Sequence, residues 1–285
     1  MTNQNKKNYF FLRGLVRESA HWAGFIEKFK KTFPEANVFL LDLPGSGILH
    51  KNEAPWSVKE MLPIVREQYR MHLSHLESSQ ENTATTNHIF ALSLGAMLAS
   101  EWMQKFPEDF SSATLVNTSY GNLSPFYRRM RPQNYFHVLR LLFSKNLKEK
   151  ENIVLHITSN AHEKHEAIAK EWALIATERP ISFPNQLRQT LAAARFSGPL
   201  AAPISNILLL TSLGDQLVHH NCTEKIYKSW LKNQNINTNI SLAIHSWAGH
   251  DLSLDDADWV LDQIKTHDGA MSRANRDPSL APKSF

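Results

Sequence analysis

The chain has 285 residues, of which 42% are hydrophobic and 20% are charged, and its formal net charge at pH 7 is +4. This length suits one large α/β domain, or one domain with an inserted subdomain. The single cysteine, Cys222, excludes an intramolecular disulfide framework and fits a reducing compartment. Neither a secretory cleavage pattern nor a run of eighteen apolar residues is present, so we expect a cytoplasmic protein without a membrane span.

Short apolar runs alternate with helical periodicity over the first part of the chain. The runs predict strands that are covered on both faces, and apolar residues at helical spacing predict helices between them. The predicted strands are 9–12, 38–41, 89–91 and 113–116. The predicted helices are 22–33, 57–76 and 94–106, and the polar segment 77–86 reads as a surface loop. Ser57 and Glu60 form the capping-box pattern that opens the second helix.

The alternation lapses between 120 and 203, where helical patterns dominate. Helices are predicted at 134–147, 161–177 and 185–196, with a short extended piece at 153–157. Strands at 207–210 and 240–244 and helices at 223–231 and 257–264 then resume the alternation. We therefore predict a core of 8–119 and 204–266, a helical insertion of 120–203 and a disordered tail of 267–285. Such alternation implies a mostly parallel, doubly wound sheet, with ligands beyond the carboxyl ends of its strands.

Ser93 lies where a predicted strand passes directly into a predicted helix. The small residues Ala91 and Gly95 flank it at minus two and plus two. This is the layout of a nucleophile elbow, a sharp turn that lifts a serine hydroxyl above the sheet. The commoner pattern has glycine in place of Ala91. An ordinary helix-capping serine is the alternative, because serine is a preferred N-cap residue.

Two further residues follow predicted strands. Asp215 comes after the strand at 207–210, and His250 comes after the strand at 240–244. The order Ser93, Asp215, His250 is the one expected of the α/β-hydrolase arrangement. A serine hydroxyl becomes nucleophilic when an imidazole accepts its proton, and a carboxylate fixes the tautomer of that imidazole.

Three other residues at strand ends or beside the base fit these roles less well. His245 is the nearest rival for the base, but it lies at the end of the strand, whereas His250 lies in the loop that follows. Asn117 ends another strand, and as a neutral amide it cannot act as the carboxylate. Asp251 follows the base directly and is expected to cap the next helical segment.

Over residues 8–266 the chain resembles the α/β-hydrolase superfamily. The segments that carry the resemblance are 11–15, 41–45, 91–95, 214–215 and 249–252. Within the superfamily it is most similar to small bacterial carboxylesterases with a helical lid, including the group that cleaves pimeloyl-carrier-protein methyl ester. The resemblance implies a sheet of about six strands, with the first two strands of the family missing, and a lid formed by 120–203.

The resemblance also implies further site residues. The oxyanion hole is expected to use the backbone N–H groups of Leu94 and Leu15. The usual His-Gly pair of the family appears as Arg13-Gly14, and Arg17 and Glu18 are expected either to pair with each other or to be exposed. Three aromatic residues of the lid are expected to line an acyl pocket or to pack the lid onto the core: Phe126, Tyr127 and Phe136.

The sequence thus predicts a serine hydrolase that cleaves a carboxylic ester or thioester without cofactor or metal. The alternatives are an acyltransferase that uses the same residues and a binding protein that keeps the fold without catalysis. Residues 121–150 hold seven lysines and arginines against Glu149. This basic segment favours an acidic acyl carrier protein or an anionic substrate as partner, and a solvated helical face is the alternative. No glycine-rich phosphate loop is present, and we expect no nucleic-acid partner.

Two histidines at i, i+3, His162 and His165, raise the possibility of a metal site. Their spacing does not match a zincin motif, and no third ligand is evident in the sequence. Polarity of a surface helix explains them better.

Overall fold

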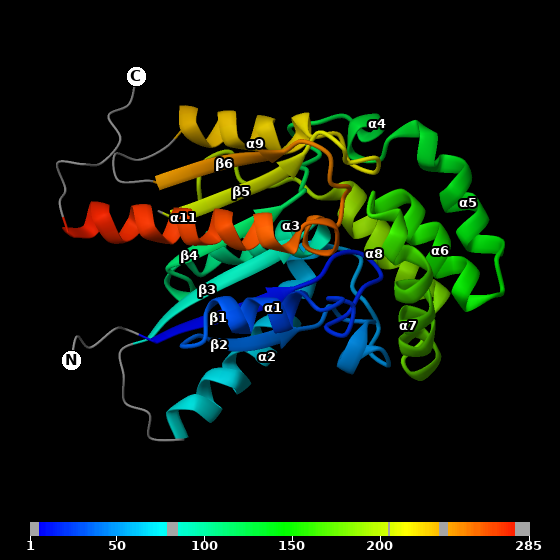
Figure 1. Ribbon diagram of the computed structural model, residues 1–285, viewed down its shortest axis with the longest axis horizontal. Helices are drawn as coiled ribbons and strands as arrows, with labels where there is room; N and C mark the ends of the chain where they lie inside the picture. Colours follow the sequence, from blue (N-terminus) through cyan, green and yellow to red (C-terminus); the bar gives the residue numbers. More distant parts are fainter. Residues whose placement is uncertain (1–5, 79–84, 205, 234–238, 277–285) are drawn as a thin grey trace.

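The computed structural model describes residues 6–78, 85–204, 206–233 and 239–276. A six-stranded sheet runs through the centre, with helices on both faces (Figure 1). The strand order is β2-β1-β3-β4-β5-β6, and every neighbouring pair is parallel. The strands are β1 Lys6–Leu12, β2 Asn37–Leu41, β3 Thr85–Leu92, β4 Ser112–Val116, β5 Asn206–Ser212 and β6 Asn239–His245. The prediction of a mostly parallel sheet of about six strands is confirmed.

Successive side chains of β1 enter different halves of the core. Phe10 and Leu12 pack on one face of the sheet, and Tyr9 and Phe11 pack on the other. This follows from the pleat, because alternate side chains of a strand point to opposite faces. A strand buried on both faces therefore needs a continuous apolar run, and this is why the run at 9–12 was readable in the sequence.

Five helices cover the two faces. The first face carries α2 Val58–Ser78, α3 Leu94–Lys105 and α9 Asn221–Lys232, and the second carries α1 Phe25–Thr32 and α11 Ala257–Arg276. The capping box of α2 is formed, since the Ser57 hydroxyl accepts from the Glu60 N–H and donates to the Glu60 carboxylate. A predicted doubly wound architecture is thus present.

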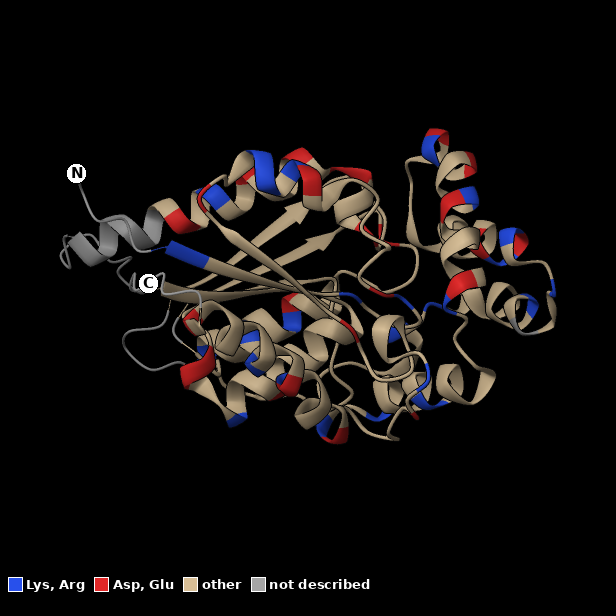
Figure 2. Ribbon diagram, turned by 90° about the horizontal axis from the view of Figure 1, so that it is seen from below, with Lys and Arg blue, Asp and Glu red and all other residues tan. Residues whose placement is uncertain are grey.

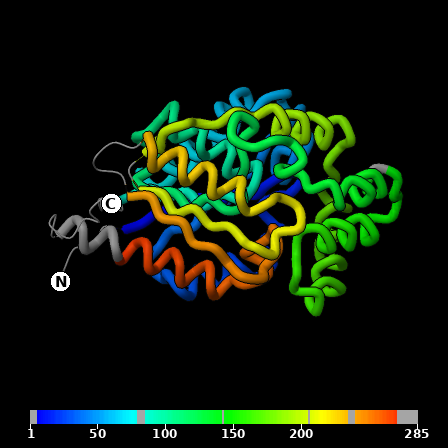
Figure 3. Tube along the Cα trace, turned by 90° about the horizontal axis from the view of Figure 1, so that it is seen from above, coloured from blue at the N-terminus to red at the C-terminus, as the bar shows by residue number. Residues whose placement is uncertain are grey.

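A run of helices connects β4 to β5 and lies beyond the carboxyl ends of the strands (Figures 1 and 3). Its α-helices are α4 Phe126–Arg129, α5 Tyr135–Phe143, α6 Leu147–Thr158, α7 His165–Glu178 and α8 Phe183–Arg195. We call this run, residues 126–195, the helical insertion. The edge of the sheet where a ligand is expected in α/β folds therefore faces the insertion.

Two predictions about local structure are wrong. The piece at 153–157 is not extended, because it lies inside α6. Alternate residues of this piece are buried, as they would be in a strand, but the Asn146 side chain caps the helix by accepting from the Glu149 N–H. The predicted surface loop at 77–86 is shorter, since α2 runs to Ser78 and β3 begins at Thr85, and 79–84 lie outside the described residues.

The tail prediction is also wrong for 267–276, which continue α11 to Arg276. Polar contacts rather than apolar periodicity hold this turn of the helix. Lys7 and Tyr9 both donate to the Asp268 carboxylate, at 2.6 and 2.8 Å. His267 contacts the Ser241 hydroxyl through Nδ1. Residues 277–285 lie outside the described residues.

His88 of β3 is buried between two hydroxyl groups. Its ring stacks on Tyr9, and its two nitrogens contact Ser112 and Thr86. Burial lowers the pKa of His88 from 6.5 to about 4. Between these values the unfolded chain binds a proton that the folded chain does not, so the stability is complete above pH 6.5 and falls as the pH drops towards 4.

We expect the free energy of unfolding to be about 3 kcal/mol lower at pH 4 than at pH 7 because of this histidine. The measurement is the free energy of unfolding in urea at a series of pH values. His88→Gln keeps polar atoms but cannot titrate, so its stability should fall less steeply in that window. An equal slope in both proteins would contradict the assignment.

In the part of the chain that the structure describes, every helix is too short or too polar to cross a membrane.

Candidate active site

Ser93 occupies the turn between β3 and α3 with an unusual backbone conformation. Its φ is 56° and its ψ is −116°. A non-glycine residue with positive φ is strained and persists only where its surroundings hold it. Here the Ser93 N–H donates to the carbonyl of Val116, at 2.9 Å, and the Thr118 hydroxyl donates to the Ser93 carbonyl. The backbone geometry is that of a nucleophile elbow.

Glycines let the chain pass close to this turn. A Cβ on Gly95 would lie 2.5 Å from the carbonyl oxygen of Arg13 and 2.7 Å from that of Leu12. A Cβ on Gly14 would lie 2.9 Å from the Cβ of Ser93. These approaches bring the loop after β1 against the serine. Ala91, at the position where glycine is commoner, is fully buried and is accommodated within β3.

Asp215 and His250 are joined by a buried hydrogen bond. The Nδ1 atom of His250 lies 2.8 Å from Oδ2 of Asp215. The other carboxylate oxygen accepts from the N–H groups of Leu217 and Val218, at 2.8 and 2.9 Å. Because the carboxylate accepts, Nδ1 carries the proton and Nε2 of the neutral ring is left as an acceptor. Nε2 is buried and has no hydrogen-bond partner among the residues that the structure describes.

A short chain of contacts links the serine to the histidine. Val116 accepts from the Ser93 N–H, and the next residue, Asn117, donates through Nδ2 to the carbonyl of His250 at 2.7 Å. Asn117 also has a positive φ, of 46°. Its amide therefore holds the backbone of the histidine. In the described part of the chain no hydrogen bond joins Ser93 to Nε2 of His250, and such bonds are often long in enzymes without substrate.

His245, the rival for the base, has both ring nitrogens occupied. Its Nδ1 accepts from the N–H groups of Trp247 and Ala248, at 3.2 and 2.9 Å. Nε2 must then carry the proton, and it faces the Asp256 carboxylate at 3.2 Å. The ring thus shapes the turn that leads to His250 and has no free acceptor.

Two backbone N–H groups near Ser93 are available for an anion. Leu94 is the first residue of α3, where an N–H has no partner within the helix. Leu15 follows Gly14, whose backbone touches Ser93. Neither the Leu94 N–H nor the Leu15 N–H donates a hydrogen bond to any other described residue. Both donors were expected for the oxyanion hole, and this role stays a prediction.

Gln189 of α8 fixes the loop that carries Leu15. Its Oε1 accepts from the N–H of Val16 at 2.9 Å, and its Nε2 donates to the Pro44 carbonyl and the Ser46 hydroxyl, both at 3.0 Å. The side chain is fully buried, and Val16 has a φ of 57°. The insertion therefore determines how the N–H groups of this loop point. Nothing in the sequence indicated this glutamine.

Replacing Gln189 by leucine should leave the Val16 N–H buried without an acceptor. We expect the free energy of unfolding to fall by about 1–3 kcal/mol. Urea unfolding measures the effect. The matched control is Gln186→Leu, one turn earlier in α8, since the Gln186 amide bonds only to the nearby Ile181 carbonyl. Equal losses in both variants would contradict the role of Gln189.

The loop after β1 is also tied to the histidine loop by a buried ion pair. Arg13 donates to both carboxylate oxygens of Asp251, at 3.2 and 2.6 Å, and its guanidinium lies 4.8 Å from the centre of the Trp22 ring. Asp251 caps the short helix α10 Leu252–Asp255, as the sequence predicted. Burial alone would raise the pKa of the Asp251 carboxyl, but the Arg13 guanidinium holds it below its usual value.

Arg17 and Glu18 are neither exposed nor paired with each other. Arg17 pairs with Glu151 of α6 at 2.8 Å, and Glu18 accepts from Arg179, which follows α7, at 2.6 Å. Both partners belong to the helical insertion. The expectation that these two residues pair or lie at the surface is therefore wrong, because charges that follow β1 meet opposite charges brought by the insertion.

Asn160 and Asp255 hold together the loops that carry Asp215 and His250. The Asn160 amide, between α6 and α7, donates to the carbonyls of Gly214 and Trp247, at 2.9 and 2.7 Å. Asp255 accepts from the N–H of Gly249 at 2.6 Å and from the N–H of Asn160 at 2.8 Å. The neighbours of Asp215 and of His250 are thus bridged by one side chain of the insertion.

The three predicted pocket residues lie on the outer side of α4 and α5. Phe126, Tyr127 and Phe136 each have more than half of their surface exposed. Their role in binding a substrate stays a prediction. His165, from the suggested metal pair, contacts the Ser159 hydroxyl through Nε2.

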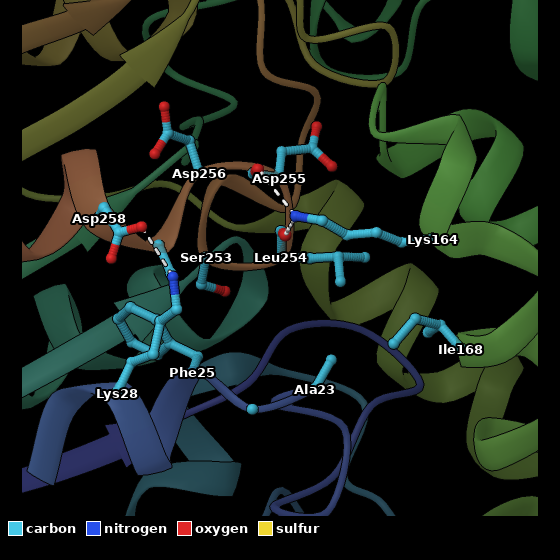
Figure 4. Close-up of a pocket in the computed structure, with 12 residues that line it drawn as sticks. Ala23, Phe25, Lys28, Lys164, Ile168, Ser253, Leu254, Asp255, Asp256 and Asp258 are labelled. Atoms are coloured by element: carbon cyan, nitrogen blue, oxygen red, sulfur yellow. Dashed lines mark hydrogen bonds and ion pairs between the residues drawn. The ribbon is translucent and has the colours of Figure 1, made fainter. Parts of the chain in front are cut away.

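A hollow of about 280 Å³ lies beside residues 253–258 (Figure 4). It is lined by α1, α7, α10 and the start of α11, and neither Ser93 nor His250 borders it. Lys164 crosses it to donate to the carbonyls of Leu254 and Asp255, and Lys28 pairs with Asp258 at its rim. The hollow is therefore separate from Ser93 and His250.

Comparisons with known proteins agree with this architecture. No family model and no curated protein sequence matches the chain. Solved structures do match. The hydrolase BphD from Rhodococcus sp. strain RHA1, which acts on 2-hydroxy-6-oxo-6-phenylhexa-2,4-dienoate, is 16% identical with a TM-score of 0.65, over 93% of this chain and 91% of that one.

Two other matches are similar in extent. Carboxylesterase CesB from Bacillus subtilis is 14% identical with a TM-score of 0.63, over 93% of this chain and 84% of its own. The RedJ thioesterase of the prodiginine pathway in Streptomyces coelicolor is 13% identical with a TM-score of 0.58, over 92% and 86%. With its six parallel strands and its serine at the strand–helix turn, the chain has the α/β-hydrolase fold.

Proposed function

We propose that the protein is a serine hydrolase that cleaves a carboxylic ester or a thioester. Ser93 is the nucleophile, His250 the general base and Asp215 the residue that orients His250. The observation that carries the proposal is the pairing of Asp215 with Nδ1 of His250, which leaves a buried, unoccupied Nε2 in a fold whose elbow holds a serine.

The reaction proceeds in two steps. Nε2 of His250 takes the proton of the Ser93 hydroxyl while Oγ attacks the carbonyl carbon, and the resulting oxyanion accepts from the N–H groups of Leu94 and Leu15. The imidazolium then protonates the leaving alcohol or thiol, and an acyl-enzyme remains. In the second step His250 activates a water molecule that releases the acid. Each oxyanion donor is worth about 2.7–4 kcal/mol of transition-state stabilisation in enzymes of this kind.

The helical insertion serves as the lid of the site, and 8–119 with 204–266 form the core that carries the triad. The helical insertion lies beyond the carboxyl ends of the strands and contacts the loops after β1, β5 and β6, and both observations support its role as the lid. An acyl chain would lie between lid and core. An ester or thioester is the proposed substrate class because a carboxylesterase and a thioesterase are among the structural neighbours. The basic residues at 121–150 suit an anionic substrate, an acidic acyl carrier protein included.

A fluorophosphonate probe tests the proposal directly. The wild-type protein should be labelled at Ser93, Ser93→Ala should not be labelled, and His250→Ala should be labelled far more slowly. His245→Ala is the matched control, because His245 is also buried and ends β6 five residues before His250, but it has no free acceptor. Absence of labelling in the folded wild type would overturn the proposal and favour a binding protein.

Product analysis separates hydrolysis from acyl transfer. Incubation of a p-nitrophenyl ester series in water should yield the free acid, and the chain length with the highest kcat/KM sizes the pocket. If an added alcohol or thiol is acylated and free acid forms only in its absence, the protein is an acyltransferase.

A further inference from the structure

Large apolar side chains gather on the outside of α4 and α5. We call them the α4–α5 patch: Phe126, Tyr127, Tyr135, Phe136, Leu139 and Phe143. Phe136 is 70% exposed and Phe143 is 76% exposed. The rings of Phe126 and Tyr135 lie 6.3 Å apart, which makes the patch continuous from one helix to the next. Soluble surfaces rarely keep apolar groups together in this way unless something covers them.

The patch forms a stripe along α5. Phe136, Leu139 and Phe143 stand at i, i+3 and i+7, so they share one side of the helix. That side does not pack on the rest of the protein, since all three residues are exposed. The stripe is therefore not part of the core that the insertion makes with the sheet.

Basic residues flank the stripe in the sequence, and some of them are engaged elsewhere. Residues 126–150 hold seven lysines and arginines and one glutamate. Arg129 is buried against the carbonyls of Ala193 and Ala194, and Lys148 pairs with Glu166. Figure 2 marks both basic and acidic residues on the helices at this end of the molecule. Arg140 in α5 uses its charge on Glu149, at 2.7 Å, but Lys145 and Lys150 form no ion pair with any described residue. Lysines beside an exposed apolar helix face are the pattern by which interfacial helices lie on anionic lipid.

The position of α5 suits a flat partner. It lies at the outer edge of the insertion, away from the sheet (Figures 1 and 3). An outward-facing helix can dip its apolar side into a lipid surface without a complementary groove. A second copy of the chain would bring an equally basic patch against this one, and like charges disfavour that contact.

We propose that the α4–α5 patch is a docking surface for an anionic membrane. Phe136, Leu139 and Phe143 enter the boundary between headgroups and acyl chains, and Lys145 and Lys150 contact lipid phosphates. This surface stands apart from the triad, so it does not depend on the proposed activity.

Sedimentation with lipid vesicles tests the proposal. The protein should bind vesicles of phosphatidylcholine mixed with phosphatidylglycerol, bind pure phosphatidylcholine more weakly, and lose binding as salt is raised. The double variant Phe136→Ser with Phe143→Ser should lower the partition coefficient about tenfold or more. Lys145→Glu with Lys150→Glu should lower it by a similar factor on the anionic vesicles alone.

Two controls keep the outcome clear. Leu174→Ser removes a side chain that is 68% exposed on α7, outside the patch, and should leave binding unchanged. Ser93→Ala should also bind normally, which separates this surface from catalysis. The proposal is overturned if the wild type does not sediment with anionic vesicles, if Leu174→Ser weakens binding as much as the patch variant, or if the patch variants dissociate a dimer seen by light scattering.

Discussion

Replacing Asp215 by asparagine should lower kcat for an ester substrate by about four orders of magnitude. In the wild type the carboxylate accepts a hydrogen bond from the Nδ1–H group, with Nδ1 and Oδ2 2.8 Å apart, so Nε2 is free to act as the base. An amide can turn its NH₂ group to Nδ1 instead, and the proton then moves to Nε2, where it blocks the reaction. Steady-state kinetics and the rate of fluorophosphonate labelling measure the loss.

Asp256→Asn is the matched control for this prediction. Asp256 makes the same kind of contact with the other buried histidine of the region, His245, at 3.2 Å. That histidine takes no part in the proposed reaction, so kcat should change by less than about tenfold. The triad assignment would be wrong if Asp256→Asn were the more damaging of the two, or if Asp215→Asn kept most of the activity.

Replacing Arg13 by methionine should destabilise the protein by about 3–5 kcal/mol. The substitution leaves the Asp251 carboxylate buried without its cation, and both side chains of the pair are only 4% exposed. The pair also joins the residue before Gly14 to the residue after His250. We therefore expect kcat to fall as well, because the loop after β1 and the loop that carries His250 lose a shared anchor. Urea unfolding and ester kinetics give the two quantities.

An exposed ion pair, between α1 and α11, provides the comparison with this buried one. Lys28 and Asp258 lie 2.7 Å apart but are 50% and 76% exposed. Lys28→Met should cost less than about 1 kcal/mol. Adding Asp251→Asn to Arg13→Met removes the orphaned charge while keeping a helix cap, so it should restore part of the lost stability. A double variant that is less stable than Arg13→Met alone would contradict the buried-pair explanation.

The fold was readable from the sequence because its strands are buried on both faces. Runs such as 9–12 and 207–210 are continuously apolar, and each one is a strand of the sheet. Because the carboxyl ends of parallel strands meet at one edge of the sheet, the loops after β5 and β6 were predicted to bring Asp215 and His250 together. Their hydrogen bond is the contact that this reasoning anticipated.

The contacts that hold the site were beyond the sequence. Gln189 and Val16 are 173 positions apart, and Arg13 and Asp251 are 238 apart. Polar residues carry no periodic signal, so nothing in their neighbourhood shows which distant group they meet. The error at 153–157 has a related cause, since a helix that is buried on alternate residues imitates a strand.

The strand order also governs when the sheet and the site of a growing chain are complete. Strand β1 is made first and lies inside the sheet, between β2 and β3, whereas β6 is made last and forms an edge. On the ribosome, strands β1 to β5 of a nascent chain can therefore pair, and the insertion can form, before β6 emerges. Such a chain already carries Ser93 and Asp215 but lacks His250. On the proposed mechanism, hydrolysis begins only after translation has passed this histidine, so partly made chains leave cellular esters intact.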